Sequence, residues 1–377
     1  MNSRIYATSL DFLRRLVDIS GMARVVVIGG GLAGLVSAFT LLRARHSVCV
    51  VEAAETFGGQ ILTEHSHGYV IEHGAEGWVA KSEVLPQLAQ QLGIAGELIG
   101  QTVTRGLGVR DGGLQELAPG EAATMLGFQV PREDLGSGVR TFRRGTGELI
   151  DALKRALAAK VELRSGFSVD SITRMERGYR LRNPDGAQLD AERLVIATSA
   201  RAAARLLTPA CGPAAAELKN ARTLSSVTVS LAYPRAAVAH PLDATGFVVA
   251  NQDQQHGLRA CTFVSSKFES RAPADKVCLR AFFRPDDAEI NVLADATYAQ
   301  RAQAFLGALL GIQGQPEHVW VSRWADALPV FEPGHKAAVA QLSTALAGSG
   351  IALAGAAFHG SGIDAAVRSA LSVGERI

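Results

Sequence analysis

The chain has few cysteines, little net charge and no long apolar run, and each of these absences excludes a class of protein. Its 377 residues include four widely spaced cysteines without a CxxC pair, so the sequence indicates neither a disulfide framework nor a zinc or other metal site. The formal net charge of +2 gives no reason to expect nucleic acid as a partner. No run approaches the roughly 18 uninterrupted apolar residues of a transmembrane helix.

The composition that remains is that of a globular protein with a sizeable core, since 47% of the residues are apolar and 20% are charged. The length suits two or three average domains, or one nucleotide-binding domain interrupted by a second. Residues 1–21 include LDFLRRLVDI, which lacks the long apolar stretch and cleavage site of a secretory signal. We interpret 1–21 as a disordered or loosely docked extension, with a weak membrane-surface anchor as the alternative.

Residues 25–34, VVVIGGGLAG, are the most informative segment. Gly29, Gly31 and Gly34 form G-x-G-x-x-G directly after an aliphatic run, and the pattern continues as a helix, LVSAFTLLRAR. These glycines permit a tight turn, close approach to a pyrophosphate and close helix packing, while the helix N-terminus faces the phosphates. Glu52 ends the next apolar run, 23 residues after Gly29, where an acidic side chain accepts the hydroxyls of an adenosine ribose. This order predicts an adenine-dinucleotide site, and the glycines alone leave NAD, NADP and FAD open.

Periodicity predicts how the rest of the chain is organised. We expect a helix over 82–99, an amphipathic helix within 142–159, and short strands through 161–198. An antiparallel block follows, with strands at 225–232, 246–250, 258–264, 276–283 and 318–324 and a helix at 295–311. The C-terminal segment is again strand, glycine turn and helix. A nucleotide-binding signature at both ends with an antiparallel block between them predicts an α/β molecule of two interleaved domains.

Several segments resemble the flavin-containing amine oxidase superfamily. Glu52-Ala53, followed by Gly58-Gly59 and Thr63 and a strand ending in Gly74-Ala75-Glu76, is similar to its N-terminal signature. The closing LAGAAFHGSGIDAAVRSALSVGERI resembles its C-terminal flavin segment. Within the superfamily, the chain most resembles the oxygen-dependent protoporphyrinogen/coproporphyrinogen oxidases, on GLRACTFVSSKFESRAPADKVCLRAFF, RWADALPVFEPGH and this C-terminal segment. The resemblance covers most of residues 23–100 and 142–377.

The resemblance implies FAD as the cofactor. It also implies an α/β fold in which a Rossmann-like FAD-binding domain (22–99, 140–204 and 315–377) is interleaved with an α+β, antiparallel-sheet substrate domain (100–139 and 205–314). In such proteins the double glycine passes the pyrophosphate, the second glycine segment lies against the isoalloxazine ring, and amides at the C-terminal helix face the flavin N1–O2 edge. The residues expected to bind FAD are Gly29, Gly31, Leu32, Ala33, Gly34, Glu52, Ala53, Gly58, Gly59, Gln60, Gly74, Ala75, Glu76, Gly77, Trp78, Val169, Gly355, Gly362 and Ile363.

The activity implied by the resemblance is transfer of hydride from a porphyrinogen to flavin N5, with O2 as acceptor and H2O2 as product, in haem and porphyrin biosynthesis. Aromatisation supplies the driving force, so no dedicated base is required. The chain departs from its relatives at Gln60, where many have a basic residue. It also has only about 40 residues between the first flavin block and FRRGTGELIDAL, where relatives insert a longer helical segment. We therefore interpret it as a shortened member. Two alternatives stay open: an FAD-dependent oxidase or desaturase of another small molecule, such as a secondary metabolite or amine, and a flavin-binding, non-catalytic haem-pathway partner.

Few side chains are candidates for catalysis or substrate binding. His359, in the turn next to the expected flavin edge, is the catalytic candidate, with packing as the alternative role. Arg143, Arg144 and Arg259 are candidates for binding substrate carboxylates, with ordinary surface positions as the alternative.

Lys267 is a third kind of candidate. Amine oxidases of the superfamily carry a lysine on the strand that corresponds to 225–233, and this chain has none there. Lys267 is a conceivable substitute, but we favour a solvated turn lysine beside Arg271.

The expected partners are a porphyrinogen and O2, with no nucleic acid, in the cytoplasm or loosely peripheral to a membrane. A homodimer contact, another subunit or plain solvent would cover the pocket that the shortened segment leaves.

Overall fold

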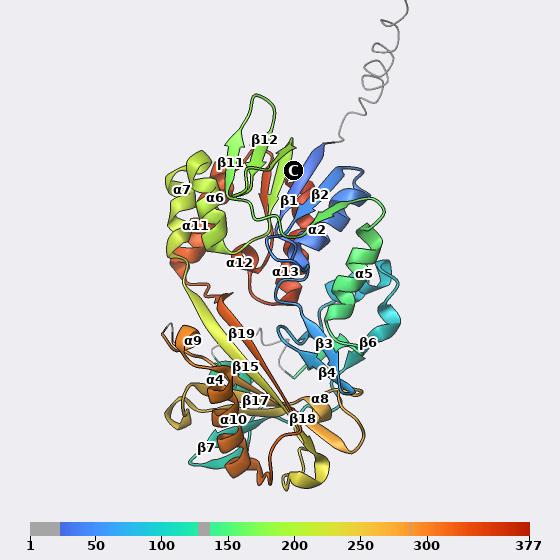
Figure 1. The fold of residues 1–377 in the computed structure, drawn as a ribbon, viewed down its shortest axis with the longest axis vertical. Helices are drawn as coiled ribbons and strands as arrows, with labels where there is room; N and C mark the ends of the chain where they lie inside the picture. The colour runs from blue at the N-terminus through green and yellow to red at the C-terminus, as the bar shows by residue number, and fades with distance from the viewer. Residues whose placement is uncertain (1–22, 127–135, 287) are drawn as a thin grey trace, which may run out of the picture.

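The computed structural model describes residues 23–126, 136–286 and 288–377, so the predicted extension at 1–21 lies outside the described residues. One lobe of the molecule is built on a five-stranded parallel sheet in the order β10-β2-β1-β14-β20 (Figure 1). Its strands are β1 (Arg24–Ile28), β2 (Ser47–Val51), β10 (Glu162–Arg164), β14 (Arg193–Ile196) and β20 (Ile351–Leu353). The sheet therefore contains strands from both ends of the chain, as the two nucleotide-binding signatures predict.

Both faces of the parallel sheet are covered, which explains its near-continuous aliphatic strands. Val25 and Val27 pack with helices α2 (Leu32–Arg43), α3 (Val84–Gln91), α5 (Gly147–Leu157) and α13 (Ile363–Leu371). Val26 and Ile28 point to the other face. There the cover is the antiparallel meander β11 (Ser171–Arg174), β12 (Tyr179–Arg182) and β13 (Gln188–Ala191), with α6 (Ala200–Cys211) and α11 (Pro333–Ala345).

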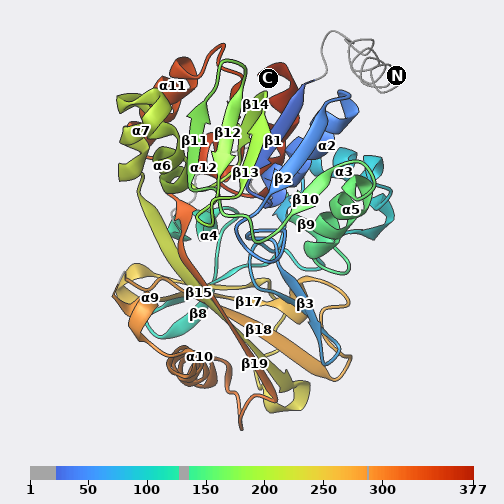
Figure 2. The same ribbon diagram turned by 45° about the horizontal axis from the view of Figure 1, so that its top comes forward.

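The other lobe is a seven-stranded sheet in the order β19-β15-β18-β17-β16-β7-β8. Its strands are β7 (Leu107–Arg110), β8 (Gly113–Glu116), β15 (Thr223–Pro234), β16 (Gly246–Val249), β17 (Leu258–Phe263), β18 (Lys276–Phe283) and β19 (His318–Pro329). Neighbouring strands are antiparallel except for β7 and β16. Helix α10 (Asp295–Leu310) covers one face, where Val229, Leu279 and Phe283 are buried with Tyr298. The long strands β15 and β19 lead from the first lobe into this one (Figures 1 and 2).

The remaining elements are short and lie mostly between the two sheets or at their edges. β3 (Thr63–Ser66) pairs with β4 (Tyr69–Glu72), and β9 (Val139–Phe142) lies between β5 (Trp78–Val79) and β6 (Leu98–Gly100). The short helices are α4 (Glu121–Leu126), α7 (Pro213–Ala216), α8 (Val264–Lys267), α9 (Glu289–Val292) and α12 (Ala356–His359). Single 3-10 turns occur at Ala95–Glu97, Glu217–Asn220, Arg235–Ala237, Asn251–Asp253 and Ser372–Glu375.

The predicted strands of the antiparallel block and the helix at 295–311 are confirmed within a few residues. The helix predicted over 82–99 is wrong in length, because α3 ends at Gln91 and the chain turns at Gly93, whose φ is +74°. Residues 98–100 then form β6 instead of a last helical turn. None of the helices within the described residues has both the length and the apolar character needed to cross a bilayer.

Candidate dinucleotide and substrate site

The turn between β1 and α2 has the close packing that the glycine fingerprint predicts. A Cβ on Gly34 would lie 1.8 Å from the carbonyl oxygen of Gly29, and a Cβ on Gly29 would lie 2.4 Å from that of Ala197. Both distances are impossible for a real side chain, so glycine is required where α2 crosses the turn. The result is a helix N-terminus pressed against the ends of β1 and β14.

Within the described residues, the N-terminus of α2 is left without a side-chain partner. Its N-cap is Gly31, no side chain caps it, and its first turn has no acidic residue. A Cβ on Gly31 would lie 3.7 Å from the Cα of Gly59, which is an ordinary van der Waals distance, so the double glycine packs against the start of this helix. Leu32 and Ala33 start the helix and are buried. A helix N-terminus with neither a side-chain cap nor an acidic first turn is suited to bind phosphate oxygens.

Glu52 lies at the end of β2, directly beside this turn. Its Oε2 accepts a hydrogen bond from the Gly30 amide at 2.6 Å and its Oε1 accepts one from the Ala54 amide at 2.8 Å. Each carboxylate oxygen keeps a further lone pair that can accept a hydroxyl. Ala53 next to it is exposed. Both bonds hold the carboxylate in one orientation, as a ribose-binding role requires.

The double glycine connects this turn to the second predicted segment. Gly58 donates its amide to Gly30 O at 2.9 Å, and Gly59 packs against Gly31. Gln60 O then accepts from the Ala75 amide at 3.1 Å, and a Cβ on Gly74 would lie 1.8 Å from that same oxygen. The segments 29–34, 58–60 and 74–78 therefore form one continuous surface. The Gln60 side chain donates to Ala327 O on β19 at 2.7 Å.

The C-terminal segment reaches the same helix. A Cβ on Gly355 would lie 3.2 Å from the Cβ of Ala33, and the Gly355 amide donates to Ser369 Oγ at 2.8 Å. Gly362 is the N-cap of α13 without a side-chain cap, and Ile363 is buried behind it. Both ends of the described chain thus meet at α2. The uncapped helix, the glycine packing and the orientation of Glu52 together fit an adenine dinucleotide.

Other predicted cofactor residues lie in the core beside this surface. Trp78 is 4% exposed and packs on Phe142 with ring centroids 5.3 Å apart. A Cβ on Gly77 would lie 2.4 Å from Arg140 O on β9. Val169 is buried, and its carbonyl accepts from Arg205 at 3.1 Å.

A largely buried ion pair adjoins the segment 74–78. Lys267 Nζ lies 2.6 Å from Glu76 Oε2, and their side chains are only 13% and 12% exposed. Arg280 donates to Gly74 O at 2.7 Å. Burial by itself raises the pKa of Glu76, but the charges of Lys267 and Arg280 outweigh it and hold the pKa below its usual value. The interpretation of Lys267 as a solvated turn lysine is wrong, because α8 turns it inward onto Glu76.

A second buried pair lies next to the first. Arg271 is 1% exposed, and its Nη1 lies 3.6 Å from Glu72 Oε1. Arg271 also donates to Phe142 O at 3.0 Å, and the Thr146 amide donates to Glu72 at 2.7 Å. Burial outweighs these contacts and raises the pKa of Glu72 above its usual value. Sequence patterns did not identify either pair, because the partners are remote in the chain.

These contacts identify the face of the seven-stranded sheet that packs against the cofactor lobe, which is the lobe that contains the parallel sheet and the dinucleotide surface. Residues 279, 281 and 283 of β18 point to the α10 side, so Arg280 and Phe282 point to the opposite side. Since Arg280 reaches Gly74, this opposite side is the cofactor-facing side of the sheet. Thr228 and Ser230 of β15 share it, by the same alternation.

The predicted catalytic histidine is hydrogen-bonded within its own lobe. His359 ends α12, and although the residue is exposed, its Nε2 lies 3.2 Å from both Arg376 Nη1 and Leu353 O. Because Arg376 also donates to Leu353 O, at 2.9 Å, Nε2 is best placed as an acceptor from Arg376. Partial desolvation of the ring and the charge of Arg376 lower the pKa of His359. The imidazole is therefore neutral at pH 7.

The three predicted substrate arginines have different surroundings. Arg143 pairs with Glu269 at 2.5 Å and Arg144 with Glu148 at 3.5 Å, both near the surface. Arg259 is partly buried on β17, and its Nη2 donates to Leu126 O at 3.3 Å. Of the three, Arg259 is the one without an anionic partner in the described part of the chain.

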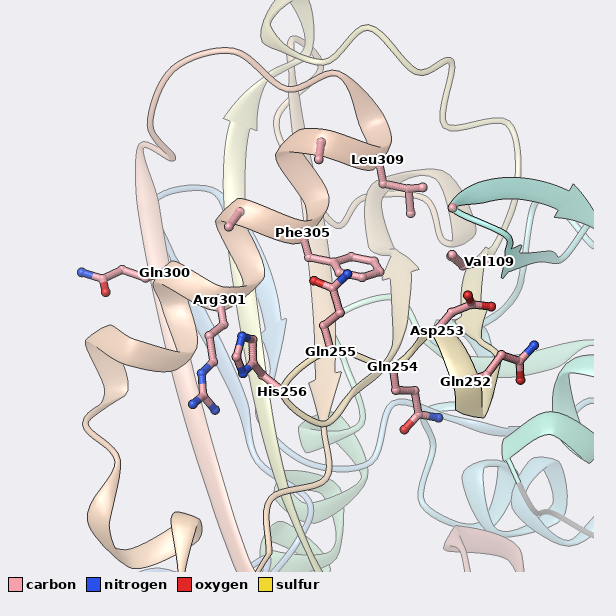
Figure 3. Close-up of a pocket in the computed structure, with 13 residues that line it drawn as sticks. Val109, Gln252, Asp253, Gln254, Gln255, His256, Gln300, Arg301, Phe305 and Leu309 are labelled. Carbon is pink, nitrogen blue, oxygen red and sulfur yellow. The ribbon is translucent and has the colours of Figure 1, made fainter.

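A cavity of about 660 Å³ opens on the α10 side of the seven-stranded sheet (Figure 3). It is lined by one flank of α10, including Arg301 and Phe305, and by the turn 252–256. Arg301 pairs with Glu289 at 3.3 Å. Because it lies opposite the cofactor-facing side, this cavity is separate from the dinucleotide site. No group of three or more potential metal ligands occurs in residues 23–126, 136–286 and 288–377.

Comparison with known proteins identifies the relatives of this chain. A model of the flavin containing amine oxidoreductase family matches residues 113–377, and a model of an NAD(P)-binding Rossmann-like domain matches residues 27–92. The coproporphyrinogen III oxidase of Bacillus subtilis is 26% identical over an alignment of 450 residues, covering 91% of this chain and 95% of the relative. That of Propionibacterium freudenreichii subsp. freudenreichii is 34% identical over 62% of this chain and 43% of the relative.

Solved structures share the fold. A protein of Exiguobacterium sp. 255-15, assigned as a protoporphyrinogen oxidase, superposes with a TM-score of 0.81 at 23% identity and covers 94% of this chain and 99% of its own. The Bacillus alignment is longer than this 377-residue chain and therefore contains gaps, as expected of a shortened member.

Proposed function

Because this chain belongs to the flavin-containing amine oxidoreductase family and uses FAD, we propose that it oxidises a porphyrinogen to a porphyrin with O2 as the electron acceptor. The observation that carries the proposal is the match of 91% of the chain to a relative named for coproporphyrinogen III oxidation. The structure supports it, because the dinucleotide surface of one lobe faces the seven-stranded sheet of the other lobe. A homodimer contact and a location in the cytoplasm or at a membrane surface stay predictions from the sequence.

The residues of the site would divide the work of holding the cofactor. The N-terminus of α2 would bind the pyrophosphate and Glu52 the ribose, while residues 58–60 and 74–77 would line the rest. FAD supplies the redox chemistry when bound, taking a hydride from carbon and delivering the electrons to O2 as H2O2. The N-terminus of α13, uncapped at Gly362, would place positive helix dipole beside the cofactor.

The side chains near this surface are suited to positioning and not to proton abstraction. Glu76, the carboxylate of the segment 74–78, is held by Lys267. His359 already accepts a hydrogen bond from Arg376. This agrees with a six-electron oxidation that is driven overall by aromatisation of the final porphyrin and in which protons leave to solvent.

The proposal can be tested with FAD-loaded protein mixed anaerobically with coproporphyrinogen III, protoporphyrinogen IX or a panel of small amines. We expect a porphyrinogen to bleach the flavin absorbance. Admission of air should then restore it, with fluorescent porphyrin and three H2O2 formed for each six-electron oxidation. Flavin that is reduced by an amine but by neither porphyrinogen would refute the proposal in favour of another oxidase. Flavin that binds and is reduced by none of them would favour a non-catalytic role.

A further inference from the structure

The cofactor-facing side of the seven-stranded sheet carries an arginine that the site described above does not use. Arg284 follows β18 and continues its ladder, since its amide donates to Gly257 O at 2.8 Å. Alternation along the strand therefore places Arg280, Phe282 and Arg284 on the same side. Arg280 is 2% exposed and bonded to Gly74 O, whereas Phe282 and Arg284 are only partly buried.

Arg259 reaches the same side from the neighbouring strand. The register of β17 and β18 shifts between Leu258 and Ala260, so Arg259 is the extra residue of a β-bulge, a feature that commonly re-aims a side chain. Its guanidinium donates to Leu126 O at the end of α4. Helix α4 lies on the cofactor-facing side, because its Glu121 pairs with Arg110 of β7. Side chains alternate along β7, so Arg110 points away from the α10 side, where Val109 is buried. Arg259 and Arg284 thus lie together on this side.

Neither guanidinium is balanced by a carboxylate of the described chain. Burial first, and then the charge of Arg284, lower the pKa of Arg259; burial and then Arg222 lower that of Arg284. Among the residues that the structure describes, no acidic group offsets either effect. Since arginine stays protonated at neutral pH, these effects represent repulsion between partly desolvated cations. By contrast, Arg222 and Arg301 pair with Glu332 and Glu289 at 2.9 and 3.3 Å.

We propose that Arg259 and Arg284 form a binding site for carboxylate groups of the substrate, with the ring of Phe282 packing against its apolar body. The proposal rests on the proposed function and names how this chain recognises that substrate. Guanidinium groups bind carboxylates through paired, charge-assisted hydrogen bonds, and an anion would relieve the repulsion between the two arginines. A tetrapyrrole is an apolar ring edged with carboxylates, which matches a partly exposed phenylalanine on the same side of the sheet as the two arginines. Because coproporphyrin has four carboxylates and protoporphyrin two, the site favours the coproporphyrin series.

The site can be tested by binding, without turnover. Coproporphyrin III is titrated into the FAD-loaded wild type and into R259Q and R284Q, and its fluorescence gives the Kd. R301Q is the matched control, since it removes an arginine from the α10 side of the same sheet. We expect each of R259Q and R284Q to raise the Kd about 10-fold, and R301Q to leave it unchanged. Protoporphyrin IX should show a smaller change. Added salt should weaken binding to the wild type more than to the R259Q/R284Q double variant.

The outcomes separate this site from the proposed function. Unchanged circular dichroism and FAD content in the variants show that a raised Kd is not caused by unfolding. Coproporphyrin III that binds the wild type and both variants equally, or does not bind the wild type, overturns the carboxylate site even if porphyrinogen oxidation is observed. Arginine-dependent binding without any oxidation refutes the proposed function and leaves the site standing.

Discussion

Replacing Lys267 by methionine should destabilise the protein strongly, because it leaves a buried carboxylate without its closest cation. The Lys267 and Glu76 side chains are 13% and 12% exposed, and their charged atoms are 2.6 Å apart. Removing one partner of a buried pair typically costs about 3–5 kcal/mol. Arg280 remains near Glu76 and compensates part of its charge, so we expect about 3 kcal/mol for K267M.

Urea unfolding of the FAD-loaded protein, followed by circular dichroism, measures this loss. The matched control is K276M, because Lys276 pairs with Glu317 at 2.7 Å on the surface of the same sheet, where solvent screens the pair. The double variant E76Q/K267M should recover part of the stability, since it removes the unpaired charge as well. If K267M costs no more than K276M, the ion pair does not stabilise the junction between the lobes.

The pH dependence of the same variant gives a second check. The pKa of Glu76 lies below its ordinary value of 4.5, so the stability from the pair is present above pH 4.5 and is lost as the pH falls through the lowered pKa. The difference in unfolding free energy between wild type and K267M should therefore be largest at neutral pH and shrink in acid. A difference that is independent of pH would show that packing, and not charge, causes the loss.

Three further predictions concern the cofactor site. G34A should purify with little FAD, by flavin-to-protein absorbance, because its Cβ would lie 1.8 Å from Gly29 O; normal FAD content would contradict the turn geometry. E52Q should raise the Kd for FAD, measured by calorimetry, about 10-fold, because the charge-assisted hydrogen bonds of the carboxylate are lost. An unchanged Kd would exclude Glu52 as a ribose ligand. The pKa of His359 is lowered from 6.5, so the wild type should lose stability as the pH falls below 6.5, and H359Q should lose less. Parallel melting temperatures between pH 8 and 5 would contradict that.

The dinucleotide turn could be predicted from the sequence because its constraints are local. Gly29, Gly31 and Gly34 are required by contacts within one strand, one turn and one helix. Glu52 lies at the end of the adjacent strand, so its place beside Gly30 follows from parallel pairing of β1 and β2. Such rules need no knowledge of the rest of the fold.

Lys267 could not be placed in the same way. Its partner Glu76 is 191 positions away, and the two meet only after the lobes have packed. A turn lysine in a polar stretch is ordinarily solvated. The single helical turn α8 reverses that expectation, because it directs the side chain back toward the cofactor lobe. Arg284 likewise has no local signal, since it lies just past the end of a predicted strand.

One signal in the sequence did point to the junction between the lobes. Arg280 interrupts the otherwise apolar strand VCLRAFF, and a charged residue in a buried strand requires a partner. That partner is a backbone carbonyl, Gly74 O, which no residue pattern can identify. The other buried cations, Lys267 and Arg271, come from the same lobe, and each meets acceptors from the cofactor lobe. Contacts of this kind therefore orient the seven-stranded sheet toward the dinucleotide surface. In this chain, the arginine within an apolar strand is the sequence feature that indicates where the two lobes meet.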